Sequence, residues 1–151
     1  LNVKPKTKNH DCVITKHSLE GLVNSDENLD ALIIRTLPNT ENKKTKIYSN
    51  TNPPYLLPEA AQYIKESNIK HLLLDLPSVD KERDKGLLAA HKAFWGDPKS
   101  IRHGCTITEL IYVPDIIEDG YYLLNLQLAP FENDAAPSRP LLFKLISSYE
   151  I

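Results

Sequence analysis

Two residues with metal-binding side chains, His91 and Glu109, lie where the sequence pattern turns them towards the protein interior. His91 shares the apolar stripe of a predicted helix, and Glu109 shares one face of a predicted strand with apolar residues. A buried carboxylate is costly unless it is protonated, paired or bound to a metal, so these residues form a candidate pair of metal ligands. A hydrogen-bonded His–Glu pair with a purely structural role explains the same pattern, and periodicity leaves both alternatives open.

A second group of polar residues, Asp75, Ser78 and Asp80, follows a run of apolar residues. Ligands of α/β proteins collect at the carboxyl ends of buried strands, so acidic residues at this position favour a site. Asp and Ser are also common turn residues, and a capped turn without a function is the other interpretation.

Apolar runs and helical periodicity predict the elements that position these groups. Strands are expected over residues 31–36, 69–76, 105–111, 121–128 and 141–146. One helix should begin at Pro58 and end at Ser67–Asn68, and a buried strand follows it, which is half of a β-α-β unit and predicts parallel strand pairs. A second helix is expected over residues 86–95, and its apolar stripe contains Leu87, Leu88, His91, Phe94 and Trp95.

The remaining segments are expected to be less regular. We interpret residues 1–10 as a polar tail, residues 19–23 as a short helix capped by Thr15 or Ser18, and residues 25–28 as a polar turn. Residues 39–54 and 130–140 are expected to form two loops. A loop as long as 39–54 within a compact domain is usually functional or mobile.

The composition excludes several classes of protein. With 151 residues and 41% hydrophobic content, the chain is expected to form one domain over residues 1–151. The 18 Lys and Arg residues against 20 Asp and Glu give no basic field for nucleic acid. No apolar run reaches the roughly 18 to 20 residues of a membrane span, and no signal core follows the N-terminus, so we expect a soluble, cytoplasmic protein. Cys12 and Cys105 lack the spacing of a disulfide framework or a thiolate zinc site.

Three segments together resemble the cyclase family, which includes bacterial kynurenine formamidases and isatin hydrolases. They are residues 74–80 (LDLPSVD), 90–93 (AHKA) and 107–110 (ITEL). The resemblance covers about residues 13–146, and this part of the chain is similar to the C-terminal portion of the family members. The resemblance implies an α/β fold of the swivelling β/β/α type, with a mixed sheet and flanking helices. It also implies that His91 and Glu109 are metal ligands and that Asp75, Ser78 and Asp80 shape the loop beside the metal.

The activity implied by the resemblance is hydrolysis of a C–N amide, formamide or cyclic amide bond by a metal-activated water. The cofactor would be zinc or manganese, the substrate a small amide, and the protein a homodimer or higher homo-oligomer, with no nucleic acid or membrane partner.

The chain departs from the family at one motif. The His-x-Gly-Thr-His-x-Asp-x-Pro-x-His segment, which carries the other ligands and the catalytic histidine in the family, does not occur in the chain. We therefore expect that this polypeptide lacks an N-terminal metal-motif segment and is a poor catalyst alone, with its general-base histidine in the upstream part. The alternatives are a non-catalytic domain for binding or assembly, with His91 and Glu109 as a structural pair, or a different site completed by another histidine. The histidines considered for that site are His10, His17, His71 and His103.

Overall fold

The computed structural model describes residues 1–23 and 29–145, and the chain divides into two compact units, Leu1–Ile117 and Glu118–Ile151. The predicted turn over 25–28 and the end of the predicted last strand at Ile146 lie outside the described residues. Within the described part of the chain, no helix has the length and apolar character needed to cross a membrane.

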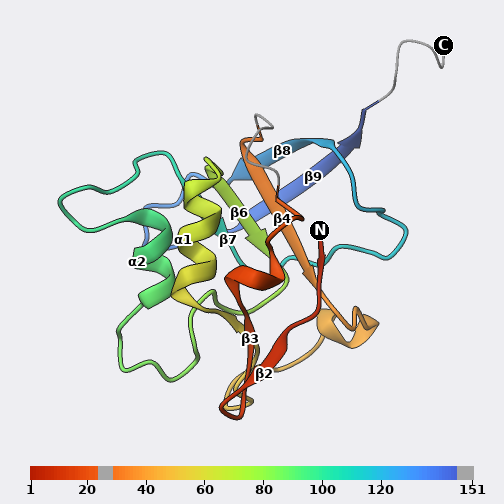
Figure 1. The fold of residues 1–151 in the computed structure, drawn as a ribbon. Helices are drawn as coiled ribbons and strands as arrows, with labels where there is room; N and C mark the ends of the chain where they lie inside the picture. The colour runs from red at the N-terminus through yellow and green to blue at the C-terminus, as the bar shows by residue number, and fades with distance from the viewer. Residues whose placement is uncertain (24–28, 146–151) are drawn as a thin grey trace. The chain divides into compact units, whose positions relative to one another are not determined.

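A parallel sheet forms the centre of the first unit. Its strands are β1 (Asn2–Val3), β4 (Ala31–Thr36), β6 (His71–Leu74) and β7 (Thr106–Thr108), in the order β1-β4-β6-β7 (Figure 1). Each neighbouring pair is parallel, with Leu32 opposite Leu72 and Leu72 opposite Ile107. The predicted parallel pairs are therefore confirmed. β4 and β6 consist largely of buried Leu and Ile, as expected for strands covered on both faces.

A smaller sheet contains β2 (Lys6–Lys8), β3 (Asp11–Ile14) and β5 (Tyr55–Leu56). β2 and β3 are antiparallel, and the turn between them consists of Asn9 and His10, with φ of 49° and 69°. Two consecutive residues of positive φ match the twist of a tight hairpin. The prediction of a polar tail over residues 1–10 is wrong, because β1, β2 and this turn occupy it.

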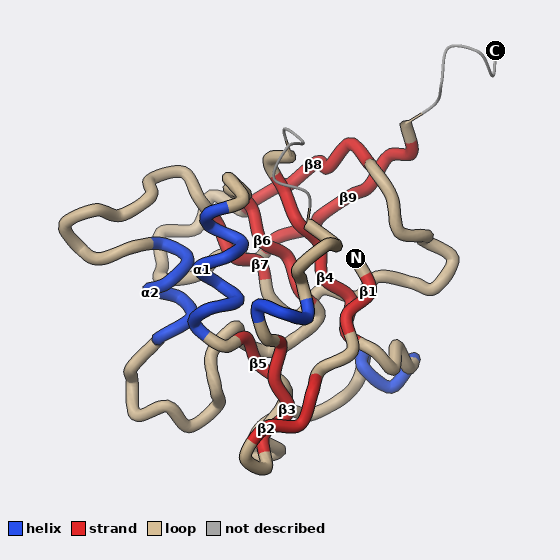
Figure 2. The backbone as a smooth tube through the Cα atoms, in the orientation of Figure 1, coloured by secondary structure: helices blue, strands red, loops and turns tan. Residues whose placement is uncertain are grey.

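Two helices cover one face of the parallel sheet, α1 (Pro58–Glu66) and α2 (Ala89–Trp95), which lie side by side (Figures 1 and 2). α1 begins with proline at a first-turn position that needs no backbone donor, and it buries Ala60, Ala61 and Ile64. Both helices were predicted. The predicted helix over 19–23 is wrong: Thr15 caps the 3-10 helix η1 (Lys16–Ser18), and a second 3-10 helix, η2 (Glu41–Lys44), lies in the predicted loop 39–54.

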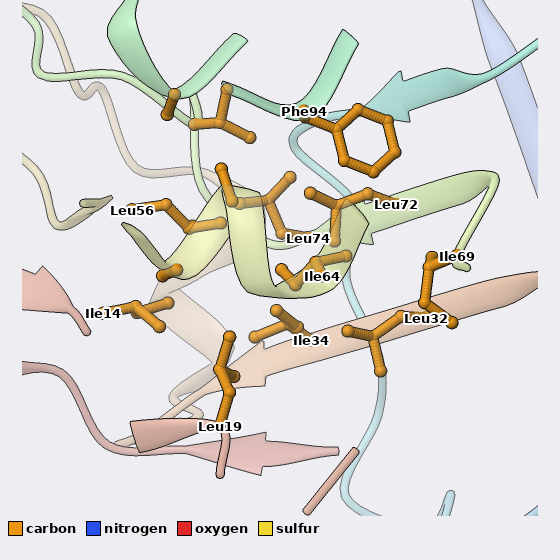
Figure 3. Packing of buried hydrophobic residues seen from close by; sticks show 14 of the residues in the cluster. Ile14, Leu19, Leu32, Ile34, Leu56, Ile64, Ile69, Leu72, Leu74 and Phe94 are labelled. Carbon is orange, nitrogen blue, oxygen red and sulfur yellow. The ribbon is translucent and has the colours of Figure 1, made fainter. Parts of the chain in front are cut away.

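The hydrophobic core lies between the helices and the sheet (Figure 3). Ile64 of α1 and Phe94 of α2 are fully buried, as are Ile34 of β4 and Leu72 and Leu74 of β6. Full burial of a side chain of this size contributes about 1.5–3 kcal/mol to folding. This packing holds α2 on the sheet.

The second unit contains a hairpin of β8 (Tyr122–Leu128) and β9 (Ser138–Lys144). The strands are antiparallel, with Leu124 opposite Leu142. The strand predicted over 121–128 is confirmed, whereas the last strand begins before the predicted position. Pro140 lies within β9 opposite Leu126. The strand tolerates proline here, because a strand with one hydrogen-bonded neighbour has every second backbone N–H pointing away from that neighbour.

Candidate functional site

The polar side chains singled out in the sequence lie around the carboxyl ends of β6 and β7. The chain leaves β6 at Leu74 and passes through Ser78 and Asp80 before it enters α2, which carries His91. Glu109 follows directly after β7. The carboxyl ends of neighbouring parallel strands lie at one edge of the sheet, where ligands of α/β proteins collect.

The His91 ring lies between two carboxylates. Its Nδ1 is 2.6 Å from Oδ2 of Asp80, and its Nε2 is 3.7 Å from Oε1 of Glu109. The His91 side chain is 18% exposed, the Asp80 side chain 7% and the Glu109 side chain 29%. The predicted inward orientation of His91 and Glu109 is therefore correct for the larger part of each side chain, and the two residues face each other.

Asp80 also caps the N-terminus of α2. Its carboxylate accepts hydrogen bonds from the backbone N–H of Ala90 (2.6 Å) and of His91 (3.3 Å), two of the donors that a helix start leaves unsatisfied. Burial raises the pKa of Asp80, but the hydrogen bonds from the His91 ring and from these two backbone donors outweigh burial and lower it below its usual value. An ionised Asp80 has no proton to donate, so Nδ1 of His91 carries the hydrogen of this contact, and Nε2 is the ring nitrogen that faces Glu109.

Glu109 has a different electrostatic environment. Burial raises the pKa of its carboxyl group above the usual value, and a hydrogen bond from the backbone N–H of Val79 (2.9 Å) and the neighbouring His91 oppose this increase. Ser78 also contacts Glu109, and its Oγ accepts a hydrogen bond from the backbone N–H of Asp80 (3.1 Å). The loop 78–80 thus contacts both sides of the His91–Glu109 pair.

Asp75 has other partners. Its fully buried carboxylate accepts hydrogen bonds from the backbone N–H of Thr36 (2.9 Å) and from the Thr36 hydroxyl (2.8 Å). Nζ of Lys43, on η2, lies 2.7 Å from Asp75 Oδ2. The structure therefore brings together Ser78, Asp80, His91 and Glu109, while Asp75 joins the end of β4 to η2. Sequence reasoning missed Lys43, which lies in a polar run that resembles a solvated loop.

The start of α2 differs from the prediction. Leu87 and Leu88 were expected on the apolar stripe, but they are 64% and 47% exposed and precede the helix. Lys85, Gly86 and Leu88 have φ values of 58°, 76° and 48°, which are incompatible with a right-handed helix. The helix can begin only at Ala89, where the Asp80 carboxylate accepts its free backbone donors.

The donor set fits part of a metal site. Metal-ligating histidines commonly donate their second ring N–H to a carboxylate, as His91 Nδ1 does to Asp80, which leaves the other ring nitrogen for the metal. Among residues 1–23 and 29–145, no group of three or more His, Cys, Asp and Glu side chains could hold a metal ion. His91 and Glu109 could supply two ligands, fewer than the three that a catalytic zinc site usually takes from the protein. His17 pairs with Glu20 at 3.1 Å, and His71 contacts the Thr106 hydroxyl at 3.0 Å.

Comparison with known proteins gives a match to a family model and to several curated proteins. The family model named Cyclase, described as "Putative cyclase", matches residues 1–81. Kynurenine formamidases of Bacillus mycoides (strain KBAB4) and Bacillus cytotoxicus are each 32% identical over 89 residues, which is 59% of this chain and 39% of the relative. The chain thus aligns with well under half of the length of these curated relatives. His91 and Glu109 lie beyond the segment that the family model matches.

Two solved structures share the fold. One is described as "The Structure Of Potential Metal-Dependent Hydrolase With Cyclase Activity" and has a TM-score of 0.62 and 21% identity, covering 87% of this chain and 58% of its own. The other, a "predicted metal-dependent hydrolase from Bacillus stearothermophilus", has a TM-score of 0.63 and 20% identity, covering 93% of this chain and 60% of its own. The expected α/β fold with flanking helices is confirmed. Its larger sheet is parallel, and its smaller sheet, β2-β3-β5, is mixed.

Proposed function

Because the chain belongs to the cyclase family, as its motifs predicted, we propose that the protein is a metal-dependent hydrolase acting on a C–N amide, formamide or cyclic amide bond. The observation that carries this proposal is the fixed His91 ring, whose Nδ1 is held by Asp80 and whose Nε2 faces Glu109. The names of the related kynurenine formamidases support the hydrolysis of an amide-type bond.

Each residue of the site has a role in this proposal. His91 Nε2 and the Glu109 carboxylate would bind a divalent metal, zinc or manganese. When bound, the metal supplies Lewis acidity, which lowers the pKa of a water molecule and polarises the scissile carbonyl. Asp80 keeps the proton on Nδ1 of His91 and fixes the plane of the ring, and the Val79 N–H fixes the orientation of Glu109. Asp75 would act indirectly by holding the start of the loop.

The proposed site needs further metal ligands and a general base in addition to His91 and Glu109. Catalytic zinc sites usually have three protein ligands and an open position, whereas His91 and Glu109 provide two. We place the remaining ligand or ligands and the general-base histidine in a part of the protein outside residues 1–151. The proposal further includes a small amide substrate, a cytoplasmic location and a homodimer or higher homo-oligomer.

The proposal is tested in the full-length protein by His91→Ala and Glu109→Ala. Each substitution should abolish retention of zinc or manganese after desalting and abolish hydrolysis of N-formylated aromatic amines. His103→Ala is the matched control, since His103 is exposed and not part of the pair. Wild-type metal content and rate in either site variant would refute the assignment.

The same experiment tests the alternative of a non-catalytic binding or assembly domain. If His91 and Glu109 form a structural pair only, both variants lose stability while the full-length wild-type protein neither retains metal nor hydrolyses the amide.

A further inference from the structure

We infer that Trp95 is a positioning residue, which fixes the His91 ring relative to Glu109; the inference rests on the function proposed above. Trp95 lies one helical turn after His91 on α2. The centroids of the two rings are 5.1 Å apart and their planes are inclined by 47°. His91 is therefore restrained at Nδ1 by Asp80 and on its ring by the indole.

The other end of the indole is attached to the strand that leads to Glu109. Nε1 of Trp95 donates a hydrogen bond to the backbone carbonyl of Cys105 at 3.2 Å. Cys105 immediately precedes β7, and Glu109 immediately follows β7. One side chain thus contacts the His91 ring and the backbone at the start of the segment 105–109, which ends in Glu109, so it links the two members of the pair.

Arg102 makes this link rigid. Its backbone N–H donates to the Trp95 carbonyl at 2.8 Å, and its carbonyl accepts from the Cys105 N–H at 3.2 Å. Its guanidinium donates to the carbonyl of Phe94 at 3.1 Å and to the carbonyl of Ile69, before β6, at 2.8 Å. A cation at the C-terminus of a helix also interacts favourably with the helix dipole. These contacts hold the end of α2 and the start of β7 in one position.

Removal of the indole should release the His91 ring. The hydrogen bond to Asp80 holds only one ring nitrogen, and without the indole the ring can also rotate out of that contact into other rotamers. Loss of the Trp95 contact would let Nε2 leave the neighbourhood of Glu109, and the metal would then have to order the ring on binding. Ligands that are ordered before binding bind a metal more tightly.

The positioning role is tested in the full-length, metal-free protein by nuclear magnetic resonance of the ¹⁵N-labelled His91 ring in mildly alkaline buffer. Wild-type protein should show one tautomer, with the hydrogen on Nδ1. Trp95→Leu should shift both ring nitrogens towards the values of a tautomer mixture. Ile64→Ala is the control, because Ile64 is a fully buried residue of the neighbouring helix α1 and packs in the core. It should reduce stability and leave the His91 tautomer unchanged.

The second measurement is the dissociation constant for zinc alone. Trp95→Leu should weaken zinc binding by about tenfold, in the range found when partners of metal-ligating histidines are removed. Trp95→Phe keeps a ring beside His91 and loses the bond to Cys105, so it should recover part of the affinity. Wild-type tautomer signals in Trp95→Leu would overturn the inference, as would equal tautomer shifts in Ile64→Ala.

Failure of the proposed function gives a different result. If wild-type protein neither binds zinc nor hydrolyses amides, the function proposed above is wrong. The tautomer measurement on metal-free protein still decides whether Trp95 positions His91.

Discussion

The free energy of unfolding should depend strongly on the buried ion pair between Lys43 and Asp75. The two groups are 2.7 Å apart, and their side chains are 13% and 0% exposed. Lys43→Met keeps most of the apolar stem of the side chain and removes its charge. The Asp75 carboxyl group then lies in the interior without its cationic partner.

The size of the effect follows from burial and from the remaining hydrogen bonds. Removing one partner of a buried ion pair typically costs about 3–5 kcal/mol. Asp75 keeps its hydrogen bonds from the backbone N–H and hydroxyl of Thr36, which compensate part of the lost interaction. We therefore expect Lys43→Met to lower the free energy of unfolding by about 3 kcal/mol, at the lower end of that range.

A second ion pair in the same molecule is the matched control. Lys70 and Asp30 are 2.6 Å apart, but their side chains are 57% and 71% exposed. Exposed pairs are worth about 0.2–1 kcal/mol, so Lys70→Met should have an effect within that range. Both variants are measured by urea unfolding at neutral pH. Similar losses below about 1 kcal/mol for both would refute the reasoning, because burial would then not determine the strength of the pair.

Further predictions concern the stability of the first unit. The hydrogen bond from Lys81 lowers the pKa of Asp11 to about 2, so its contribution to stability is present above pH ~4 and is lost as the pH falls towards 2. In urea unfolding at several pH values, the difference between Asp11→Asn and wild type should shrink in this interval, and a constant difference would contradict the assignment. Gly96 has a φ of 93°, and an added Cβ would lie 2.7 Å from the Ser100 carbonyl oxygen. Gly96→Ala should therefore lower the free energy of unfolding by about 1–3 kcal/mol in the same assay, whereas no change would show that the turn relaxes freely. Ile64→Ala should cost about 2–5 kcal/mol, since Ile64 is 0% exposed and its removal leaves a cavity; a loss below that range would mean that α1 collapses into the space.

The larger elements of the first unit are predictable from the sequence, and the small ones are not. β4 and β6 are runs of Leu and Ile, and α1 has proline at its start and apolar residues at helical spacing. These local signals agree with the tertiary structure. β1 and β5 have two residues each, too few to show any period, and β2 is exposed and rich in lysine. Their pairing with distant strands determines their conformation.

The candidate site is predictable to a similar extent. The helical periodicity and the motifs identify His91, and the motifs identify Glu109. The strand predicted over 105–111 is too long, because β7 ends at Thr108 and Glu109 follows it. The partners that fix them are not predictable in this way. Asp80 contacts the start of α2 only because residues 85–88 leave the helical conformation, and Trp95 reaches Cys105 across a loop. Lys43 belongs to a polar run, and its burial depends on where η2 lies.

The parallel sheet also has a consequence for how the chain folds. The strand pairs in the sheet join Asn2 to Arg35, Leu32 to Leu72, and Leu72 to Ile107, and each pairing closes a long segment of chain. The entropy of closing such segments is lost before the pairs form, so topologies with distant contacts fold more slowly than those with local contacts. During this time the apolar strands β4 and β6 are exposed to other chains. Refolding yield should therefore fall as protein concentration rises, even under conditions in which the native state is stable.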